Sequence, residues 1–474
     1  MNRVRSLVVV VAIVAAACST SSESSSDTTT TAPATDVTTT AGSADTTDSG
    51  PTSSGAGDAG DSGSDSSAGG EDIDPADLTD SFRGVTAAEI SLGVGFWDTS
   101  LFGFGFLGDP AEVWTALTEA QNARGGVNGR NLRATTADFN PADPATMLAA
   151  CIELTEDNEV FAVLGGMRGD ANNCVYEQHE TILLGSQVVV GDDTLDRARA
   201  PVAGFFTDAL AASLARIEAL DELGWLEGNI GVHFDEPAVR DTLEEPVLAA
   251  LAEVGVTDPT VLFFDDLAVD EDQAEQEQEI LQQQAIDAEL DKVIGFGPAA
   301  FALITYPDIG IELAVSEPNN FATALNQDVA PETLDGTLAA SARVNLPDDP
   351  VDELTQRCLD DFAAAQPDRR LEPAGPGVED SEDDPNHYSY VVLACRDLEL
   401  FVQAATASGA DLTNDTFATG LASLEQTSLP EVPFVSFGPD KFNGGDTLRM
   451  LEYDASADED GELVAVTDAI DLTQ

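Results

Sequence analysis

The stretch NARGGVNGRNLRATTADFNPADP, residues 122–144, contains the junction that decides the fold. The segment 110–123, which ends inside this stretch, has apolar residues at helical spacing. A Gly-Gly pair at 125–126 then predicts a left-handed helix cap. The following segment, 131–139, alternates polar and apolar residues and predicts a strand. The stretch therefore predicts a helix, a glycine turn and a strand in succession.

The same alternation continues along the chain. Strands separated by helices of roughly 10–15 residues predict parallel sheets, and wholly apolar strands predict helices on both faces of each sheet. The folded part begins near Ser81 and is too long for one compact core, so we expect an α/β protein with two doubly wound parallel sheets. The expected strands are 89–97, 131–139, 160–166, 181–190, 229–234, 260–264 and 292–297, and the expected helices include 110–123, 144–157, 209–225 and 243–255.

The first 18 residues, MNRVRSLVVVVAIVAAAC, have the pattern of a secretory signal. Arg3 and Arg5 precede an apolar run that is too short to span a bilayer, and the run ends in small residues. Because Cys18 follows three alanines directly, the segment resembles a bacterial lipoprotein signal in which this cysteine becomes the lipidated first residue. The alternative is a plain secretory signal. We expect a protein anchored by lipid to the membrane outside the cytoplasm.

Residues 19–80 are dominated by Ser, Thr, Gly, Ala and Asp and contain no Lys or Arg. Such a composition buries too little apolar surface to offset the entropy of ordering, so this segment is expected to be a disordered tether.

The chain is strongly acidic, with a formal net charge of −69 and only two lysines, Lys292 and Lys441. This charge excludes nucleic acid and the anionic membrane surface as partners on Coulombic grounds. It is typical of a protein that stays soluble in salty surroundings, where screening weakens self-repulsion.

Four cysteines remain after Cys18: Cys151, Cys174, Cys358 and Cys395. An even number outside the cytoplasm favours two disulfides, of which the sequence-local pairing is the simplest of three connectivities. Free buried cysteines are the alternative. A zinc site is not expected, because the chain has no CxxC motif and few histidines.

The segment ALTEAQNARGGVNGRNLRATTADFNPADPATMLAACIELTEDNEVFAVLGG, residues 116–166, resembles the first lobe of extracytoplasmic solute-binding proteins of the branched-chain amino acid (Leu/Ile/Val-type) class. The resemblance is dense over 89–195, looser in the following part, and returns in YVVLACRDLELFVQAATASG, residues 390–409. These motifs are specific for the fold and the class and say little about the ligand.

The resemblance implies the fold of type I periplasmic binding proteins, with the chain crossing three times between two lobes. It also implies a disulfide at Cys151–Cys174, a small solute bound between the lobes, an ABC permease as membrane partner, and no catalysis. We expect a monomer without a cofactor or metal. The expected lobes are 85–205 with 342–435, and 206–341 with 436–474.

Candidate ligand-binding residues follow the expected strands, where loops and helix starts expose unpaired N–H groups. In the loop at 166–172, Arg168 could meet a carboxylate and Asp170 an ammonium group, which would orient a zwitterion. The related amino-acid binders have a Ser or Thr pair there, and a solvated Arg–Asp pair is the alternative. The full set is Phe96, Trp97, Asp98, Thr99, Met167, Arg168, Gly169, Asp170, Ser186, Gln187, Phe234, Asp235, Phe296 and Gly297.

Phe96 and Trp97 begin an aromatic-rich loop that could line a site for an apolar solute body or simply pack within the first lobe.

Other motifs in the sequence do not favour a different function. GFGFLG at 103–108 matches GxGxxG literally, but its glycines come too far after the strand for a dinucleotide site. SADEDGE at 456–462 lacks the final Glu of a calcium loop and predicts a hairpin turn instead. No GxSxG motif or zincin helix supports an enzyme. The alternative function is an extracellular ligand-sensing module of the same fold without a permease.

Overall fold

In the computed structural model, the signal segment with Cys18 and most of the expected tether lie outside the described residues. Asp98, Thr99, Arg168, Ser186 and Gln187 also lie outside the described residues. The structure describes residues 73–97, 108–167, 169–185, 188, 190–235, 237–264, 271–297, 300–318, 321, 324–325, 329–346, 349–373, 384–457 and 461–473.

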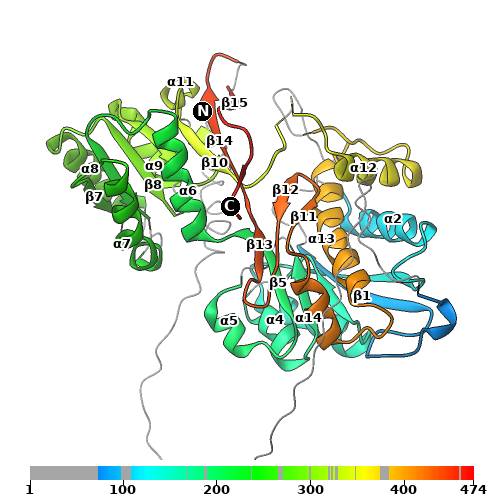
Figure 1. Cartoon of the computed structure of the whole chain (residues 1–474). Helices are drawn as coiled ribbons and strands as arrows, with labels where there is room; N and C mark the ends of the chain where they lie inside the picture. The colour runs from blue at the N-terminus through cyan, green and yellow to red at the C-terminus, as the bar shows by residue number, and fades with distance from the viewer. Residues whose placement is uncertain are drawn as a thin grey trace, which may run out of the picture. The chain divides into compact units, whose positions relative to one another are not determined.

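The first sheet has eight strands in the order β11-β12-β13-β5-β4-β3-β1-β2. Figure 1 labels β11, β12, β13, β5 and β1 of this sheet. The strands from β13 to β2 pair in parallel, and the edge strands β12 and β11 add antiparallel pairs. These strands are β1 (Glu89–Trp97), β2 (Asn131–Phe139), β3 (Ala162–Leu164), β4 (Ile182–Gly185), β5 (Val202–Thr207), β11 (Thr427–Leu429), β12 (Val432–Val435) and β13 (Asn443–Gly445).

Helices cover both faces of the first sheet. One face packs against α2 (Pro110–Ala123), α12 (Glu353–Ala365), α13 (Tyr388–Ala407) and α14 (Asn414–Ala422). The other face packs against α3 (Pro144–Ile152), the π-helical turn η4 (Glu153–Asp157), α4 (Asp170–Asn173) and a second π-helical turn, η5 (Cys174–Gln178). The short α5 (Asp192–Arg197) follows β4, and η1 (Pro75–Asp77) precedes β1.

The second sheet has the order β15-β14-β10-β9-β8-β6-β7, with β16 paired to β14. Its strands from β7 to β10 are parallel, whereas β14 and β15 form the antiparallel hairpin that the sequence predicts around 456–462. These strands are β6 (Ile230–Phe234), β7 (Thr260–Phe263), β8 (Lys292–Phe296), β9 (Glu312–Val315), β10 (Leu338–Ser341), β14 (Thr447–Asp454), β15 (Glu462–Ala465) and β16 (Ile470–Asp471).

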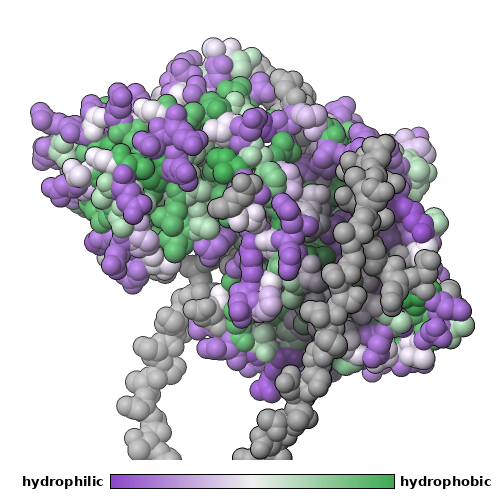
Figure 2. All heavy atoms as spheres, viewed as in Figure 1, coloured by the Kyte–Doolittle hydropathy of each residue, from purple (hydrophilic) through white to green (hydrophobic). Residues whose placement is uncertain are grey.

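Two cores flank the second sheet as well. The core on one side includes α6 (Ala209–Glu222) and α7 (Pro237–Glu253). The core on the other side includes α8 (Glu271–Asp287), α9 (Ala300–Thr305), η6 (Pro307–Ile309) and α11 (Pro331–Leu334). Hydrophilic residues spread over much of the visible surface of both parts (Figure 2).

The chain passes between the sheets three times, which confirms the expected two-sheet fold. Asp208 alone separates β5 from α6, and Asp446 alone separates β13 from β14. The remaining passage, 342–352, is longer and leads from β10 to α12. The segment 436–474, expected to close the second lobe, contributes to both sheets: β13 pairs with β5, whereas β14, β15 and β16 belong to the second sheet.

The junction at 122–144 folds as predicted, to the residue for α2 and β2. Asp109 caps α2 by accepting a hydrogen bond from the Ala111 N–H. A β-carbon on Gly126 would lie 1.8 Å from the Arg130 carbonyl oxygen, so only glycine permits this turn. Arg130 is 1% exposed and donates to the carbonyl oxygens of Thr86, Thr79 and Ala410, which ties the turn to distant segments.

Several expected boundaries were wrong. β3 spans only Ala162–Leu164 of the expected 160–166, and α6 ends at Glu222 and not at 225. Three further elements also differ. The strand expected at 181–190 ends at Gly185, because the chain turns back there and the Val188 N–H donates to the Gly185 carbonyl. The helix expected at 144–157 finishes as the π-helical turn η4, where the Thr155 hydroxyl donates to the Cys151 carbonyl. α7 begins at Pro237, six residues before the expected start at Leu243.

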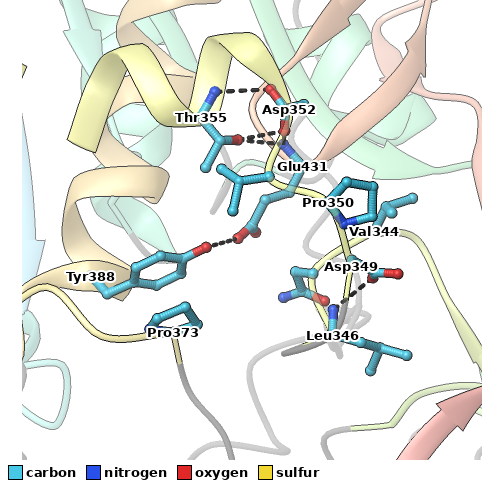
Figure 3. A pocket seen from close by; sticks show the side chains of 11 residues that line it. Val344, Leu346, Asp349, Pro350, Asp352, Thr355, Pro373, Tyr388 and Glu431 are labelled. Carbon is cyan, nitrogen blue, oxygen red and sulfur yellow. Dashed lines mark hydrogen bonds between the residues drawn. The ribbon is translucent and has the colours of Figure 1, made fainter. Parts of the chain in front are cut away.

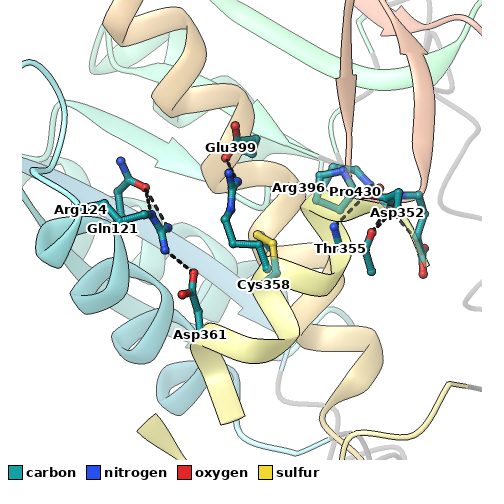
Figure 4. The surroundings of a disulfide bond; sticks show 12 residues. Gln121, Arg124, Asp352, Thr355, Cys358, Asp361, Arg396, Glu399 and Pro430 are labelled. Carbon is teal, nitrogen blue, oxygen red and sulfur yellow. Dashed lines mark hydrogen bonds and ion pairs between the residues drawn. A yellow bond between two sulfur atoms is a disulfide. The ribbon is translucent and has the colours of Figure 1, made fainter. Parts of the chain in front are cut away.

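Two disulfides join the pairs that the sequence-local reasoning favours. Cys151–Cys174 links α3 to the start of η5, and Cys358–Cys395 links α12 to α13 (Figure 4). Among the described residues, none of the helices has the length and apolar character that a membrane crossing requires.

Candidate functional site

The carboxyl edge of the first sheet is a row of glycines. Val94, Leu164, Leu184 and Ala203 are register partners across β1, β3, β4 and β5. The next residue in each case is a glycine: Gly95 within β1, Gly165 directly after β3, Gly185 at the end of β4 and Gly204 within β5. Because parallel strands present their carboxyl ends at one edge, where open α/β sheets bind ligands, this row marks the candidate site of the first lobe.

These glycines allow the backbone to pack closely at the edge. Gly185 has φ +145°, and a β-carbon there would lie 2.7 Å from the Gly165 nitrogen. Gly165 has φ +82°, and its β-carbon would lie 3.1 Å from the Gly95 oxygen. The sequence analysis missed this row, although each glycine directly follows an apolar strand segment.

The predicted residues of the first lobe lie in different surroundings. Phe96 and Trp97 are half-buried at the end of β1, where Trp97 packs against the core. Met167 is fully buried, and its backbone N–H donates to Asn172 Oδ1 at 2.9 Å. Gly169 (φ +52°) and Asp170 are exposed. Trp97, Gly169 and Asp170 therefore remain accessible at this edge.

A buried carboxylate that the sequence analysis did not single out lies beside the glycine row. Asp397 on α13 is 1% exposed, and a β-carbon on Gly165 would lie 3.7 Å from its Oδ2 atom. The first edge thus combines closely packed glycines, most of them buried, with a buried acidic group.

The predicted aromatic residues of the second lobe belong to its core. Phe234 and Phe296 are register partners on β6 and β8. Their rings stack with centroids 5.5 Å apart, and neither side chain is exposed. They lie beneath the carboxyl edge, so we leave their rings out of the site proposed below.

Asp235 follows β6 and is held by a buried histidine. His233 Nε2 lies 2.5 Å from Asp235 Oδ1, and its Nδ1 lies 2.7 Å from the Tyr306 hydroxyl. Burial raises the pKa of Tyr306, with a further contribution from the Asp235 charge, so the phenol stays protonated. Gly297 (φ +102°) approaches Asp235, whose Cβ would lie 3.3 Å from a β-carbon at that glycine. Asp235 is thus a fixed, buried carboxylate at the edge.

A small cavity lies where the passage 342–352 meets the first lobe (Figure 3). Its volume of about 20 Å³ is enough for roughly one water molecule, which excludes it as the solute site. It is lined by Val344, Asn345, Leu346, Asp349, Pro350, Val351, Asp352, Thr355, Pro373, Tyr388 and Glu431.

A buried polar cluster stands beside this cavity. Arg396 donates to the Pro430 carbonyl and to Glu431 Oε2, at 2.9 and 3.1 Å (Figure 4 shows Arg396 and Pro430). Tyr388 donates to Glu431 Oε1 at 3.3 Å, and the Val344 N–H donates to the Glu431 carbonyl. The cluster therefore binds the passage 342–352, the longest of the three, to the first lobe.

Burial controls the protonation of this cluster. Desolvation raises the pKa of Glu431, although the Arg396 charge opposes the shift. Desolvation also lowers the pKa of Arg396, to about 10, which leaves the guanidinium charged at neutral pH.

No protein-family model matches the sequence, and no curated protein matches it. Solved structures do share its fold. An ABC transporter substrate-binding protein from Desulfitobacterium hafniense, in complex with Leu, is 18% identical with a TM-score of 0.55, over 80% of this chain and 100% of that one. A fatty acid ABC transporter substrate-binding protein from Thermomonospora curvata is 16% identical with a TM-score of 0.51, over 82% and 94%.

A branched-chain amino acid ABC transporter protein from Thermus thermophilus, with bound valine, is 15% identical with a TM-score of 0.51, over 81% and 96% of the two chains. At these identities the likeness concerns the fold. Together with the two parallel sheets and the three passages between them, it shows that the chain has the two-lobed fold of type I periplasmic binding proteins that the sequence resemblance implied.

Proposed function

We propose that this protein is an extracytoplasmic receptor that binds a small solute and delivers it to an ABC importer, without catalysis of its own. The observation that carries the proposal is the pair of parallel sheets joined by three passages, in the fold shared with substrate-binding proteins of ABC transporters. In such an arrangement the solute contacts both lobes and stabilises the closed state through contacts that the open state lacks.

The solute would meet the carboxyl edges of both sheets. In the first lobe we propose contacts from Trp97, Gly169 and Asp170, and from the predicted loop residues Asp98, Thr99, Arg168, Ser186 and Gln187. In the second lobe, Asp235 and the backbone at Gly297 are the proposed contacts. Charged side chains of both signs beside the aromatic Trp97 suit a small polar or zwitterionic compound with an apolar body.

An amino acid or a related compound is the proposed solute class. The structures of the same fold were determined with Leu and with valine, and one of the proteins is described as a fatty acid binder. We further propose that Cys18 is lipidated, that residues 19–80 tether the folded part to the membrane, and that the receptor acts as a monomer.

A thermal-shift screen of small metabolites on the purified full chain tests the proposal. A ligand that binds only the folded state raises the melting temperature by mass action. We expect amino acids or other small carboxylic compounds to give saturable shifts. A screen in which no small solute shifts the melting temperature would contradict the receptor function.

The fluorescence of Trp97 tests its place in the site. In a variant that keeps only Trp97 (Trp114→Phe, Trp225→Phe), a saturating ligand should change the emission, because the half-buried indole lies at the first edge. The matched control keeps only Trp225, which packs in the second-lobe core beneath Lys292, and its emission should not change. Equal responses in the two variants would remove Trp97 from the proposed site.

A further inference from the structure

Arg216 is a buried arginine of the second lobe that has no acidic partner among the described residues. It lies on α6, on the same face as the core residues Ile217 and Leu220, and is 2% exposed. An arginine on such a face normally pairs with a carboxylate, because an unpaired buried charge is strongly unfavourable.

One edge of the guanidinium is fixed by its neighbours. Nη1 donates to Ser316 Oγ at 3.0 Å, and Ser316 Oγ in turn donates to the Gly295 carbonyl at 3.2 Å. The central Cζ atom lies 4.2 Å from the centroid of the Phe296 ring, a favourable cation–π distance. The orientation of the group is therefore set from two sides.

The other edge has no hydrogen-bond partner among the residues that the structure describes. Nε and Nη2 are both buried, and neither has a hydrogen-bond partner in the described part of the chain. In the planar guanidinium these two N–H groups point the same way, as a parallel pair that matches the two oxygens of a carboxylate. The unused donors thus have the shape of a bidentate anion site.

The shortage of partners is unexpected in this chain, which has 88 acidic residues against 19 Lys and Arg. Other described arginines, including Arg124, Arg357 and Arg449, pair with carboxylates. Desolvation lowers the pKa of Arg216 to about 9, so the group still carries its charge at neutral pH. Among the described residues, no carboxylate accepts a hydrogen bond from Arg216 Nε or Nη2.

Arg216 also lies next to the proposed binding edge. Phe296 is the last residue of β8, and Ser316 directly follows β9, so both mark the carboxyl edge of the second sheet. Glu317 comes next in the chain, and burial raises the pKa of its carboxyl group, opposed by the charge of Arg343.

We infer that Arg216 is the anchor for the carboxylate of the transported solute, which it binds through Nε and Nη2 while Ser316 holds its Nη1. This inference rests on the proposed receptor function and narrows the solute to compounds with a carboxylate group. The second lobe would then bind the acidic end of the solute, and the apolar body would extend toward the first lobe.

Calorimetric titration of the full chain with matched carboxylates and carboxamides tests the inference. The probes are L-leucine and L-leucinamide, isovalerate and isovaleramide, and benzoate and benzamide. We expect a carboxylate to bind the wild type and its amide to bind much more weakly. Arg216→Met should weaken that carboxylate at least about tenfold, because two charge-assisted hydrogen bonds are lost, and Arg216→Lys should give an intermediate loss.

Arg240→Met is the matched control. Arg240 belongs to the same lobe, lies 4.8 Å from the Phe263 ring centroid, and pairs with Glu244, so its loss should leave the affinity unchanged. The melting temperature of ligand-free Arg216→Met separates binding from folding. An anchor should leave it nearly unchanged, since removing an unpaired buried charge offsets the lost bond to Ser316.

The outcomes are distinguishable. Equal carboxylate affinity in wild type and Arg216→Met, or a lower melting temperature with unchanged affinity, would overturn the anchor and leave the receptor function intact. Binding of amides in preference to carboxylates would also overturn the anchor and leave the receptor function intact. Binding of no probe or metabolite at all would contradict the receptor function and the anchor together.

Discussion

Two buried arginines, one in each lobe, have opposite surroundings. Arg396 of the first lobe meets Glu431 and the Pro430 carbonyl, and a disulfide at the adjacent Cys395 ties its helix to α12. Arg216 of the second lobe meets a serine hydroxyl and an aromatic ring, with two donors left over. A buried charge with a complete set of partners holds the fold together, whereas one with unused donors is suited to bind something else.

The largest expected effect is the loss of the first arginine. Arg396→Met leaves Glu431 buried without its charged partner, so unfolding in urea should show a loss of about 3–5 kcal/mol. The loss should be smaller at low pH, where the Glu431 carboxyl is protonated. A loss below about 1 kcal/mol at neutral pH would mean that the pair contributes no more than a surface ion pair.

Removing the disulfide beside Arg396 should have the next largest effect. Cys358→Ser with Cys395→Ser opens a loop whose ends are 37 residues apart, and we expect a loss of about 2–4 kcal/mol. The paired control is Cys151→Ser with Cys174→Ser, with a separation of 23 residues. Urea unfolding of both variants under oxidising conditions measures the difference, and unchanged stability of the Cys358 variant would contradict the proposed support of α13.

The titration of Glu431 should change the free energy of unfolding by less than the loss of the disulfide does. Because burial raises its pKa, its contribution to stability is complete below the ordinary Glu pKa and is lost as pH rises through the raised value. The stability difference between wild type and Glu431→Gln should therefore shift against the wild type as pH rises from about 4 toward neutrality. A shift in the opposite direction would show that the Arg396 charge outweighs desolvation.

Giving Arg216 an acidic partner should change stability least. Ser316→Asp places a carboxylate next to the guanidinium, and we expect a change of less than about 1 kcal/mol in urea unfolding, since attraction and desolvation nearly cancel for buried pairs. The same variant should lose affinity for carboxylate probes, because its own Asp competes for the guanidinium. Ser316→Ala is the control, and unchanged affinity in Ser316→Asp would count against the anchor.

The sequence predicted the fold well where local signals agreed. β1, α2 and β2 match their expected bounds because strict periodicity, the Asp109 cap and the Gly-Gly turn all favour the same structure. The strand expected at 181–190 was too long. The apolar run 188–190 predicts a strand by its composition, although the chain has already turned at Gly185.

The candidate site was harder to predict, because its groups depend on contacts between distant segments. An arginine within a helix is normally solvated, so nothing in the local pattern separates Arg216 from Arg197, which pairs with Glu177 at the surface. The partners of Arg216 lie on β8 and after β9, about 80 and 100 residues away in the chain. Phe234 and Phe296 were nominated from their position at strand ends, but the register stacks them on each other inside the core.

The two shortest passages between the sheets set the kind of motion that this protein can perform. Thr207 and Gly445, the residues that precede Asp208 and Asp446, are register partners on β5 and β13, so both short links leave the first sheet side by side. A single residue can twist about its two dihedral angles but spans at most about 7 Å between its neighbours, so neither link can stretch. Rotation about these two adjacent links is therefore the kind of motion that they permit.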